Sequence, residues 1–418
     1  MFGFVAAYGR GAGEAVKRAL GEAGREAEYY SQGQAAAAYF GMVRRERGVK
    51  AAEYSDGRLT LVDAYPAFGV GSVEDARGLR GFFSAVMVSG EGLVLVRDHL
   101  GCRPLFIAET RGLIICSNTP AFIINAGYEP TPARPACITR LGEHGSVVET
   151  YWKPSRRHVK GDAGRILGLL RSSVERYVER GSALFFSGGL DSSILAKLCA
   201  EAGLEPMLVS AGLPGARDWA NIKSVAKLLG IEATHVEISP SDVSRAVELL
   251  RGVFGRLSLM DAAIGSVFLL QAERARELGA RSAVAGQGAD ELFGGYMKYE
   301  KIAERYGHEA VQEALWQDVM GLHAFSLPRD VLACSLVGVE LVLPYLDYEL
   351  VDYALSLPPE LKVAKTAEGY VRKRILRSVA LLLGLDEVAR SRKSALQYGT
   401  GVQRVVERLV RDGKARLS

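Results

Sequence analysis

The most constraining feature of the sequence is an apolar run that ends in two adjacent glycines and continues at once into a helical pattern. The segment reads Ala183-Leu-Phe-Phe-Ser-Gly-Gly-Leu-Asp-Ser-Ser193, and apolar side chains then recur at Ile194, Leu195, Leu198 and Cys199. A short buried strand that turns through glycines into a helix is typical of a parallel sheet with crossover helices. We therefore expect an α/β fold around this segment.

The same alternation of strand and helix extends from about residue 165 to about residue 300. We expect strands over residues 183–186, 207–211, 234–238 and 282–285, with helices between them, one of them over 219–229. After about residue 300 the spacing is helical and no further strand–loop–helix signature follows. The C-terminal part should therefore be a parallel sheet with a helical extension.

The N-terminal part has a different pattern, with short alternating apolar runs separated by glycine. These runs predict strands over residues 57–64, 82–88, 93–97, 104–108 and 112–117. The polar, proline-containing stretch Trp152-Lys-Pro-Ser-Arg-Arg-His158 is typical of a linker. We therefore expect two domains, 1–158 and 159–418.

Composition excludes several classes of protein. With 48% apolar and 24% charged residues the chain is globular, and a net charge of +4 is too small to indicate a nucleic-acid partner or a membrane surface. The five cysteines form no C-x-x-C pair and the six histidines no i,i+4 pair, which disfavours zinc and favours a reducing compartment. No run reaches the ~18 apolar residues of a membrane span. The first residues have neither the basic n-region nor the long apolar h-region of a signal peptide, so a cytoplasmic protein is expected.

The Gly-Gly segment has the chemistry of an anion cradle. Glycines let backbone N–H groups approach a phosphate, the helix N-terminus adds partial positive charge, and Ser187, Ser192 and Ser193 supply hydroxyl donors. Asp191 stands where a Walker loop has lysine, so a Mg²⁺ ion is expected between this carboxylate and the phosphates. The segment resembles the pyrophosphate loop of the ATP pyrophosphatase superfamily, which cuts ATP between its α and β phosphates. The alternative is a helix-capping turn that binds nothing.

A second loop follows the same logic after the strand at 282–285. It reads Ser282-Ala-Val-Ala-Gly-Gln-Gly-Ala-Asp-Glu-Leu-Phe-Gly-Gly-Tyr296. The carboxyl ends of parallel strands meet at one edge of a sheet, so Asp290 is expected to face Asp191 as a second Mg²⁺ ligand. The alternative here is an Asp-Glu cap of the next helix.

Together the two loops resemble the synthetase domain of the asparagine synthetase family. Four further segments agree with that family in order: Ala211-Gly-Leu-Pro-Gly-Ala-Arg-Asp218, Leu343-Pro-Tyr-Leu-Asp347, Lys373-Arg-Ile-Leu-Arg377 and Arg392-Lys-Ser-Ala-Leu-Gln-Tyr-Gly-Thr-Gly401. The resemblance covers about residues 165 to 401. It implies a domain of the adenine-nucleotide α-hydrolase (HUP) type.

The resemblance also implies the site and the reaction. ATP would be bound by Phe185, Ser187, Gly188, Gly189, Leu190, Asp191, Ser192, Ser193, Ala211, Ala285 and Gly286, with Asp191 and Asp290 holding Mg²⁺. Lys393 would be the catalytic lysine over the α-phosphate. The alternative is that Lys393 belongs to a solvated basic surface. A carboxylate, most simply that of aspartate, attacks ATP to form an acyl adenylate, and ammonia then displaces AMP to leave an amide.

One residue departs from the family pattern. Gln287 stands where family members usually carry Glu in Gly-Glu-Gly, a residue thought to meet the acyl adenylate or the incoming ammonia. An amide keeps the shape and the hydrogen bonds of that residue but cannot take a proton. Either ammonia loses its proton elsewhere, or the amine and the acid differ from those of asparagine synthesis.

The N-terminal half resembles the closing part of a class II glutamine amidotransferase domain, a four-layer α+β sandwich of the Ntn-hydrolase type. The matching segments are Arg97-Asp-His-Leu-Gly-Cys-Arg-Pro-Leu-Phe106, Ile115-Cys-Ser-Asn118 and Tyr151-Trp-Lys-Pro154. Phe2 stands where the family has its nucleophilic cysteine. The domain is therefore expected to be unable to hydrolyse glutamine. A β-rich domain unrelated to amidotransferases is the alternative.

These observations predict an ATP-dependent amide-forming ligase, most simply an ammonia-dependent one that makes asparagine. Three alternatives remain open: a relative that joins another acid and amine, such as a lactam-forming synthetase with a Tyr–Glu pair as base; an ATP-binding regulator without turnover; and, weakest, a protein that modifies transfer RNA. A homo-oligomer is possible, and the sequence does not decide it.

Overall fold

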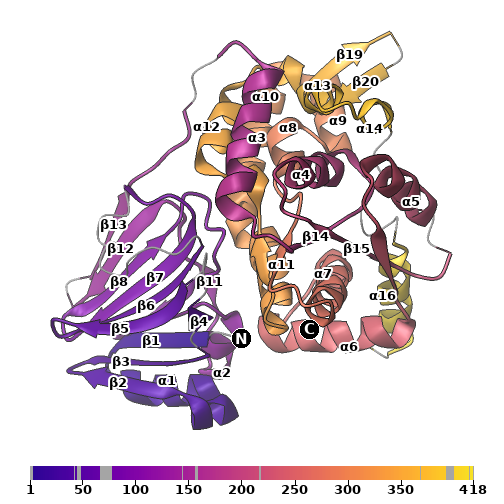
Figure 1. The fold of residues 1–418 in the computed structure, drawn as a ribbon. Helices are drawn as coiled ribbons and strands as arrows, with labels where there is room; N and C mark the ends of the chain where they lie inside the picture. Colours follow the sequence, from indigo (N-terminus) through magenta and orange to yellow (C-terminus); the bar gives the residue numbers. More distant parts are fainter. Residues whose placement is uncertain are drawn as a thin grey trace.

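The computed structural model describes residues 3–41, 43–44, 49–65, 78–143, 145–155, 159–215, 218–367, 369–391, 400–413 and 415–417. Two parts are visible in Figure 1, a β-rich part formed by the N-terminal residues and an α/β part formed by the rest. The last strand of the first part, β13, ends at Thr150, and the first helix of the second part, α3, begins at Ala163. The boundary proposed at residues 158 and 159 falls between these two elements.

The N-terminal part consists of two antiparallel sheets that pack face to face. The six-stranded sheet has the order β11 (Thr131–Pro132), β9 (Phe106–Thr110), β10 (Leu113–Ser117), β1 (Gly3–Gly9), β3 (Ala35–Phe40) and β2 (Glu28–Gln32). The seven-stranded sheet has the order β13 (Gly145–Thr150), β12 (Cys137–Gly142), β8 (Gly92–Arg97), β7 (Phe82–Ser89), β6 (Arg58–Tyr65), β5 (Val49–Ser55) and β4 (Val43–Arg44). Alternate apolar side chains such as Phe4, Leu61, Val86 and Leu95 fill the space between the sheets.

Helices α1 (Ala12–Leu20) and α2 (Pro120–Asn125) cover the outer face of the six-stranded sheet, where Val16 and Ile123 join Val5 and Ile115 in one core. A 3₁₀ helix, η1 (Gly21–Glu26), follows α1. Among the described residues of this part, no helix covers the outer face of the seven-stranded sheet. The described residues thus form three of the four expected layers, one of helices and two of antiparallel sheet.

The C-terminal part is built on a five-stranded parallel sheet with the order β16 (Ala233–Glu237), β15 (Met207–Gly212), β14 (Ala183–Phe185), β17 (Ser282–Val284) and β18 (Glu340–Val342). In Figure 1, α4 (Leu190–Glu201) and α5 (Asp218–Leu229) lie above this sheet, and α6 (Pro240–Phe254) and α7 (Leu259–Glu277) lie below it. Helices on both faces explain why the strands read as continuous apolar runs.

The remaining elements are mostly helical, as expected after residue 300. They are α3 (Ala163–Tyr177), α8 (Ala289–Phe293), α9 (Met297–Tyr306), α10 (His308–Gly321), η3 (Leu322–Ala324), α11 (Ser326–Leu336), η4 (Pro344–Leu346), α12 (Tyr348–Ser356), η5 (Pro359–Leu361), the hairpin β19 (Val363–Thr366) and β20 (Gly369–Arg372), α13 (Arg374–Leu382), α14 (Asp386–Arg390) and α16 (Val402–Arg411). Strand β18 and this hairpin are additions to the predicted helical region. The four strands predicted between residues 183 and 285 are all present.

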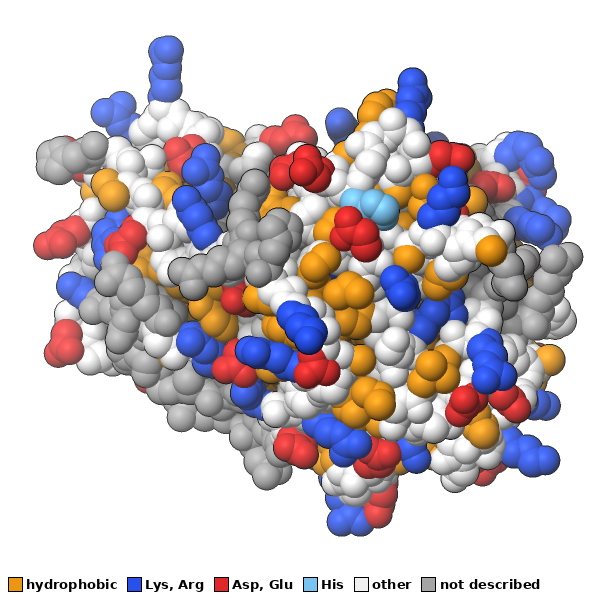
Figure 2. All heavy atoms as spheres, turned by 90° about the horizontal axis from the view of Figure 1, so that it is seen from above, with side chains coloured by type: hydrophobic (Ala, Val, Ile, Leu, Met, Phe, Trp, Pro, Cys, Tyr) orange, Lys and Arg blue, Asp and Glu red, His pale blue; other side chains and the backbone are white. Residues whose placement is uncertain are grey.

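Within the described residues, no single helix is both long and apolar enough to span a membrane. Taken together, α6 and α7 meet that length and composition, with a bend of 109° between them. On the face seen in Figure 2, basic and acidic side chains are interspersed among apolar ones.

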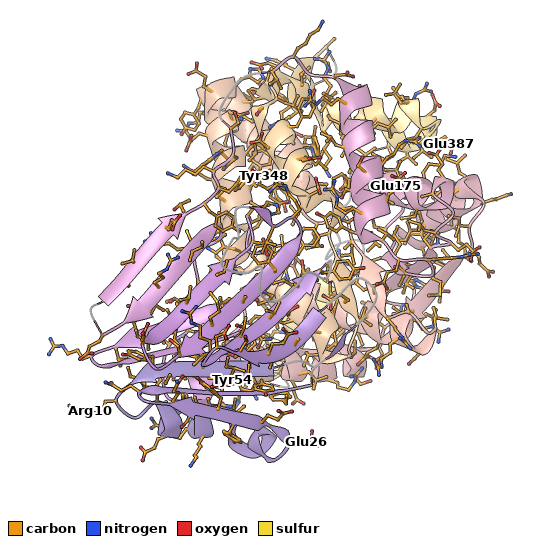
Figure 3. All side chains as sticks on the ribbon, turned by 60° about the vertical axis from the view of Figure 1, so that its left-hand side comes forward. Arg10, Glu26, Tyr54, Glu175, Tyr348 and Glu387 are labelled. Atoms are coloured by element: carbon orange, nitrogen blue, oxygen red, sulfur yellow. The ribbon has the colours of Figure 1, made fainter. Side chains whose placement is uncertain are left out.

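The two parts are joined by buried polar contacts and by aromatic rings that meet at an angle. Arg103 of the N-terminal part forms an ion pair with Glu340 of β18, and Nε2 of His99 lies 2.8 Å from the carbonyl oxygen of Leu346 in η4. The ring of Tyr348, labelled in Figure 3 at the junction of the two parts, lies 5.3 Å from that of Trp152. The N-terminal part therefore holds the segment 344–348, which also borders the candidate site.

Candidate functional site

The loop after β14 has the backbone geometry of an anion cradle. Gly188 has φ 66°, and a Cβ there would lie 2.8 Å from Nδ2 of Asn221, so glycine is required. Gly189 caps α4 without any side-chain hydrogen bond, which leaves the first-turn N–H groups without a side-chain partner. Oγ of Ser193 is buried with no hydrogen-bond partner. Unpaired donors at a helix N-terminus suit a phosphate.

The remaining sequence-predicted nucleotide contacts lie around this loop, at the carboxyl ends of three adjacent strands. Phe185 ends β14, Ala211 lies near the end of β15, and Ala285 follows β17. Hydroxyls of Ser187 and Ser192 lie 3.1 Å apart across the loop. Leu190 is the first residue of α4. The structure therefore brings this predicted set together at one edge of the sheet.

The second acidic loop touches the first. β14 and β17 are parallel neighbours, with Leu184 opposite Val284, so both loops leave the same edge of the sheet. A Cβ at Gly286 would lie 3.0 Å from Cβ of Asp191, so the backbone approaches the first loop closely. The carboxylates of Asp191 and Asp290 face one cation, the ammonium of a lysine.

That lysine is Lys373, which the sequence analysis quoted within a helix segment but gave no role. Its Nζ lies 2.7 Å from Oδ1 of Asp290 and donates a hydrogen bond to Oδ2 of Asp191. Its side chain is 4% exposed. Burial acts to lower the pKa of Lys373, but the two carboxylates outweigh burial and hold the pKa above its ordinary value. Lys373 is therefore a charged ammonium at neutral pH.

Gly295 leaves space for the side chains of Asp290 and Lys373. A Cβ at Gly295 would overlap Oδ1 of Asp290 and Cε of Lys373. Gly295 is therefore required by the close approach of the loop to these side chains.

The residues present fit a divalent cation. Oδ1 of Asp191 is buried and has no hydrogen-bond partner among the residues that the structure describes, and a lysine ammonium already lies between the two carboxylates. No group of three or more His, Cys, Asp or Glu side chains gathers in the part of the chain that the structure describes. Two carboxylates plus substrate phosphates are a usual ligand set for Mg²⁺.

The loop is also tied to the segment that contacts the N-terminal part. Oη of Tyr345 donates to the carbonyl oxygen of Asp191 at 3.2 Å, and a Cβ at Gly288 would overlap the side chain of Leu346. The segment 344–348 thus packs on both acidic loops.

Gln287 lies between the phosphate loop and a buried ion pair. Its Nε2 donates to Oδ2 of Asp330, which is bound in turn by Arg329. The sequence analysis gave neither of these two residues a role. Their contact with Gln287 joins α11 to the loop after β17.

A hydrogen-bonded Tyr–Glu pair adjoins Asp290. Oη of Tyr296 donates to Oε1 of Glu291 at 2.6 Å. Burial and then the charge of Asp290 raise the pKa of Glu291 to about 7. A carboxyl group with this pKa can exchange a proton near neutral pH.

Two sequence predictions fall outside the described residues. Lys393 and Phe2 both lie there, so the catalytic role of Lys393 stays a prediction.

Comparison with known proteins identifies the family of the chain. The asparagine synthase family model matches residues 165–309 and 297–417. A putative glutamine-hydrolysing asparagine synthetase of Methanocaldococcus jannaschii is 32% identical over 253 residues, which cover 54% of this chain and 47% of that protein. Glutamine-hydrolysing asparagine synthetase 1 of Arabidopsis thaliana is 31% identical over 335 residues, which cover 76% of this chain and 56% of that protein.

The chain thus spans about half the length of these curated relatives. Among solved structures, the glutamine phosphoribosylpyrophosphate amidotransferase of B. subtilis matches 79% of this chain and 96% of its own, at 12% identity and a TM-score of 0.30. The family model covers more than half of the sequence and includes both acidic loops and Lys373. The chain belongs to the asparagine synthase family.

Proposed function

We propose that this protein is an AMP-forming amide ligase that converts a carboxylate into an acyl adenylate and transfers ammonia to it. The observation that carries the proposal is the buried arrangement of Asp191, Lys373 and Asp290 beside the uncapped N-terminus of α4. One ammonium, two carboxylates and free N–H donors match a triphosphate with its metal. The proposed acid is the side chain of aspartate, and the product asparagine.

The chain's own groups divide the work of binding and stabilisation. N–H groups at the start of α4 and the hydroxyl of Ser193 bind phosphate oxygens. Lys373, charged at neutral pH, stabilises the negative charge that develops on the phosphates. Asp191 and Asp290 would hold Mg²⁺, which when bound neutralises phosphate charge. Lys393 is proposed to act on the α-phosphate, as the family resemblance implies.

We further propose that residues 1–158 form an amidotransferase-like domain without glutaminase activity. All five cysteines of the chain are free and buried. Burial raises the pKa of Cys116 to about 12, and it also raises the pKa of Cys102 and Cys334. Buried thiols are poor nucleophiles, so ammonia is proposed to come from solution.

Product analysis tests this function. The purified protein with ATP, Mg²⁺, aspartate and ¹⁵N-ammonium should release AMP and pyrophosphate and form ¹⁵N-asparagine, whereas glutamine should not replace ammonium. ADP instead of AMP would rule out the adenylate. Equal rates with glutamine would contradict the inactive domain.

A second candidate is a ligase whose nucleophile is an amine of the substrate itself. The observation that favours it is the Tyr296–Glu291 pair, with the pKa of Glu291 raised to about 7 by burial. Such a pair can accept the proton of an amine, which Gln287 cannot. AMP release with an amino acid that carries both groups, without added ammonium, would favour this candidate.

A further inference from the structure

Gln287 is held by a line of hydrogen-bonded polar groups that runs from the surface to the buried pair Arg329 and Asp330, and the phosphate site does not use it. Oγ of Ser258 donates to Asp261 at 2.6 Å, and Nη1 of Arg329 lies 2.9 Å from Oδ1 of Asp261. Nε of Arg329 donates to Oδ1 of Asp330 at 2.7 Å, and its Nη2 donates to Oδ2 at 3.1 Å. Nε2 of Gln287 completes the line at Oδ2 of Asp330. α7, α11 and the loop after β17 are thereby joined.

Asp330 is an anion in this arrangement. Its side chain is fully buried, and burial raises its pKa, while the bidentate guanidinium of Arg329 opposes that shift. Both groups of Arg329 that reach the carboxylate are N–H donors, so neither could accept a carboxyl proton. The charged pair Arg329–Asp330 is therefore the consistent state.

An anionic Asp330 fixes which way the amide of Gln287 faces. A carboxylate only accepts hydrogen bonds, so the NH₂ end of the amide must face Asp330. The other end, the carbonyl Oε1, has no hydrogen bond to any residue that the structure describes. Gln287 is half-buried, between Gly286 at the phosphate loop and Gly288. The site therefore offers a ligand one oriented acceptor.

We propose that Arg329 and Asp330 are positioning residues that orient the Gln287 amide so that Oε1 accepts an N–H of the amine nucleophile. The inference rests on the proposed function and names the class of its second substrate: ammonia or a primary amine, in its neutral form. Its nitrogen attacks the acyl carbon, the bond from that carbon to the phosphate oxygen breaks, and AMP leaves with the electron pair. The amine's surplus proton goes to solvent, because an amide cannot accept it.

The test separates the two half-reactions. Adenylation is followed by ATP–pyrophosphate exchange, with aspartate as the first acid in a panel, and amide formation by AMP release with ammonium chloride. In Asp330→Asn the new amide turns its oxygen to Arg329 and its NH₂ to Gln287, so Gln287 flips and presents a donor to the amine. Exchange should stay within about threefold of the unchanged protein, and amide formation should fall on the order of 10- to 100-fold, the effect of one misplaced hydrogen bond.

A second variant tests orientation against mere structure. In Gln287→Glu/Asp330→Asn, one carboxylate oxygen accepts from Asn and the other faces the amine, so amide formation should return to within about fivefold of the unchanged protein. Asp318→Asn, an equivalent change at a carboxylate paired with Lys298, is the matched control and should alter neither half-reaction. Gln287→Leu leaves the Arg329–Asp330 pair in place and should lose amide formation alone, which keeps the test open if Asp330→Asn does not fold.

The outcomes are distinct. Three results would each overturn the inference and leave the proposed function intact. The first is a parallel loss of exchange and amide formation in Gln287→Leu, and the second is unchanged amide formation in that variant or in a folded Asp330→Asn. The third is no recovery of amide formation in a folded double variant. Absence of exchange with every acid in the unchanged protein would overturn both.

Discussion

The two parts of the molecule treat buried charge in opposite ways. In the N-terminal part, the carboxylate of Asp98 accepts four backbone hydrogen bonds, from Phe83, Leu100, Cys102 and Arg103, at 2.9 to 3.1 Å. Arg97 donates to three carbonyl oxygens. At the carboxyl edge of the parallel sheet, Asp191 keeps an oxygen without a hydrogen-bond partner. At these two places, the backbone-saturated charge of Asp98 holds the fold, and the carboxylate of Asp191 is left to serve a ligand.

The largest expected effect follows from removing the cation of the site. Lys373→Met should lower ATP–pyrophosphate exchange on the order of 1000-fold, because the charge on the phosphates loses its buried partner. Lys298→Met, at an exposed lysine paired with Asp318, is the matched control and should leave exchange unchanged. Equal exchange rates in the two variants would remove Lys373 from the site.

A smaller loss is expected when the site is crowded without any change of charge. Gly295→Ala places a Cβ against Asp290 and Lys373 and should lower exchange on the order of 100-fold. Gly252→Ala, at a glycine of α6 with open space around it and no positive φ, is the control for the added methyl group. A circular dichroism melt of each variant separates loss of function from loss of structure. Full exchange by Gly295→Ala would show that the cluster tolerates displacement.

Changing Asp98, whose charge is saturated by backbone hydrogen bonds, should affect stability and leave exchange almost unchanged. Asp98→Asn turns an NH₂ group toward backbone N–H donors and should lower the free energy of unfolding by about 2 to 4 kcal/mol. Exchange per folded molecule should change less than threefold. Urea unfolding and exchange at a temperature below the melting transition measure the two. A loss of exchange without a loss of stability would invert the comparison.

The smallest effect concerns pH and the contact between the two parts. Burial lowers the pKa of His99 from its ordinary value of 6.5, so the unfolded chain binds the proton more readily than the folded one. Stability is therefore fully present above about pH 6.5 and falls as the pH drops below it, by up to about 1 kcal/mol between pH 6.5 and 5.5. His99→Gln should remove this part of the slope, while the more exposed His308→Gln serves as control. An unchanged slope in His99→Gln would contradict the assignment.

Local patterns predicted much of the fold, and long-range contacts account for the omissions. The strands and turns around Gly188 and Gly286 were predicted because each shows a short apolar run that ends in glycines, a pattern visible within a dozen residues. Strand β18 is as short as β14 and β17, but Leu343-Pro344 follows it in place of a glycine turn, so the local pattern did not mark it as a strand. β3 (Ala35–Phe40) is mostly alanine, which has low strand propensity.

In the site, too, local patterns predicted some residues, and long-range contacts bring in the others. Asp191 and Asp290 were predicted because each follows its own strand. Lys373 lies 182 residues from Asp191 in the sequence, and Asp330 lies 43 residues from Gln287, so only the folded chain brings them together. The Lys-Arg-Ile-Leu-Arg segment was a signal that could have identified Lys373, but a basic residue before a helix is also common on a solvated surface.

The most direct test of the central claim is ATP–pyrophosphate exchange by Asp191→Asn, measured beside its free energy of unfolding. The charge of Asp191 serves the nucleotide and its metal in this account, and Asp290 still pairs with Lys373 in the variant. The account predicts that exchange falls by at least about 100-fold, while stability changes by less than about 1 kcal/mol. Exchange that persists in a folded Asp191→Asn protein would contradict it.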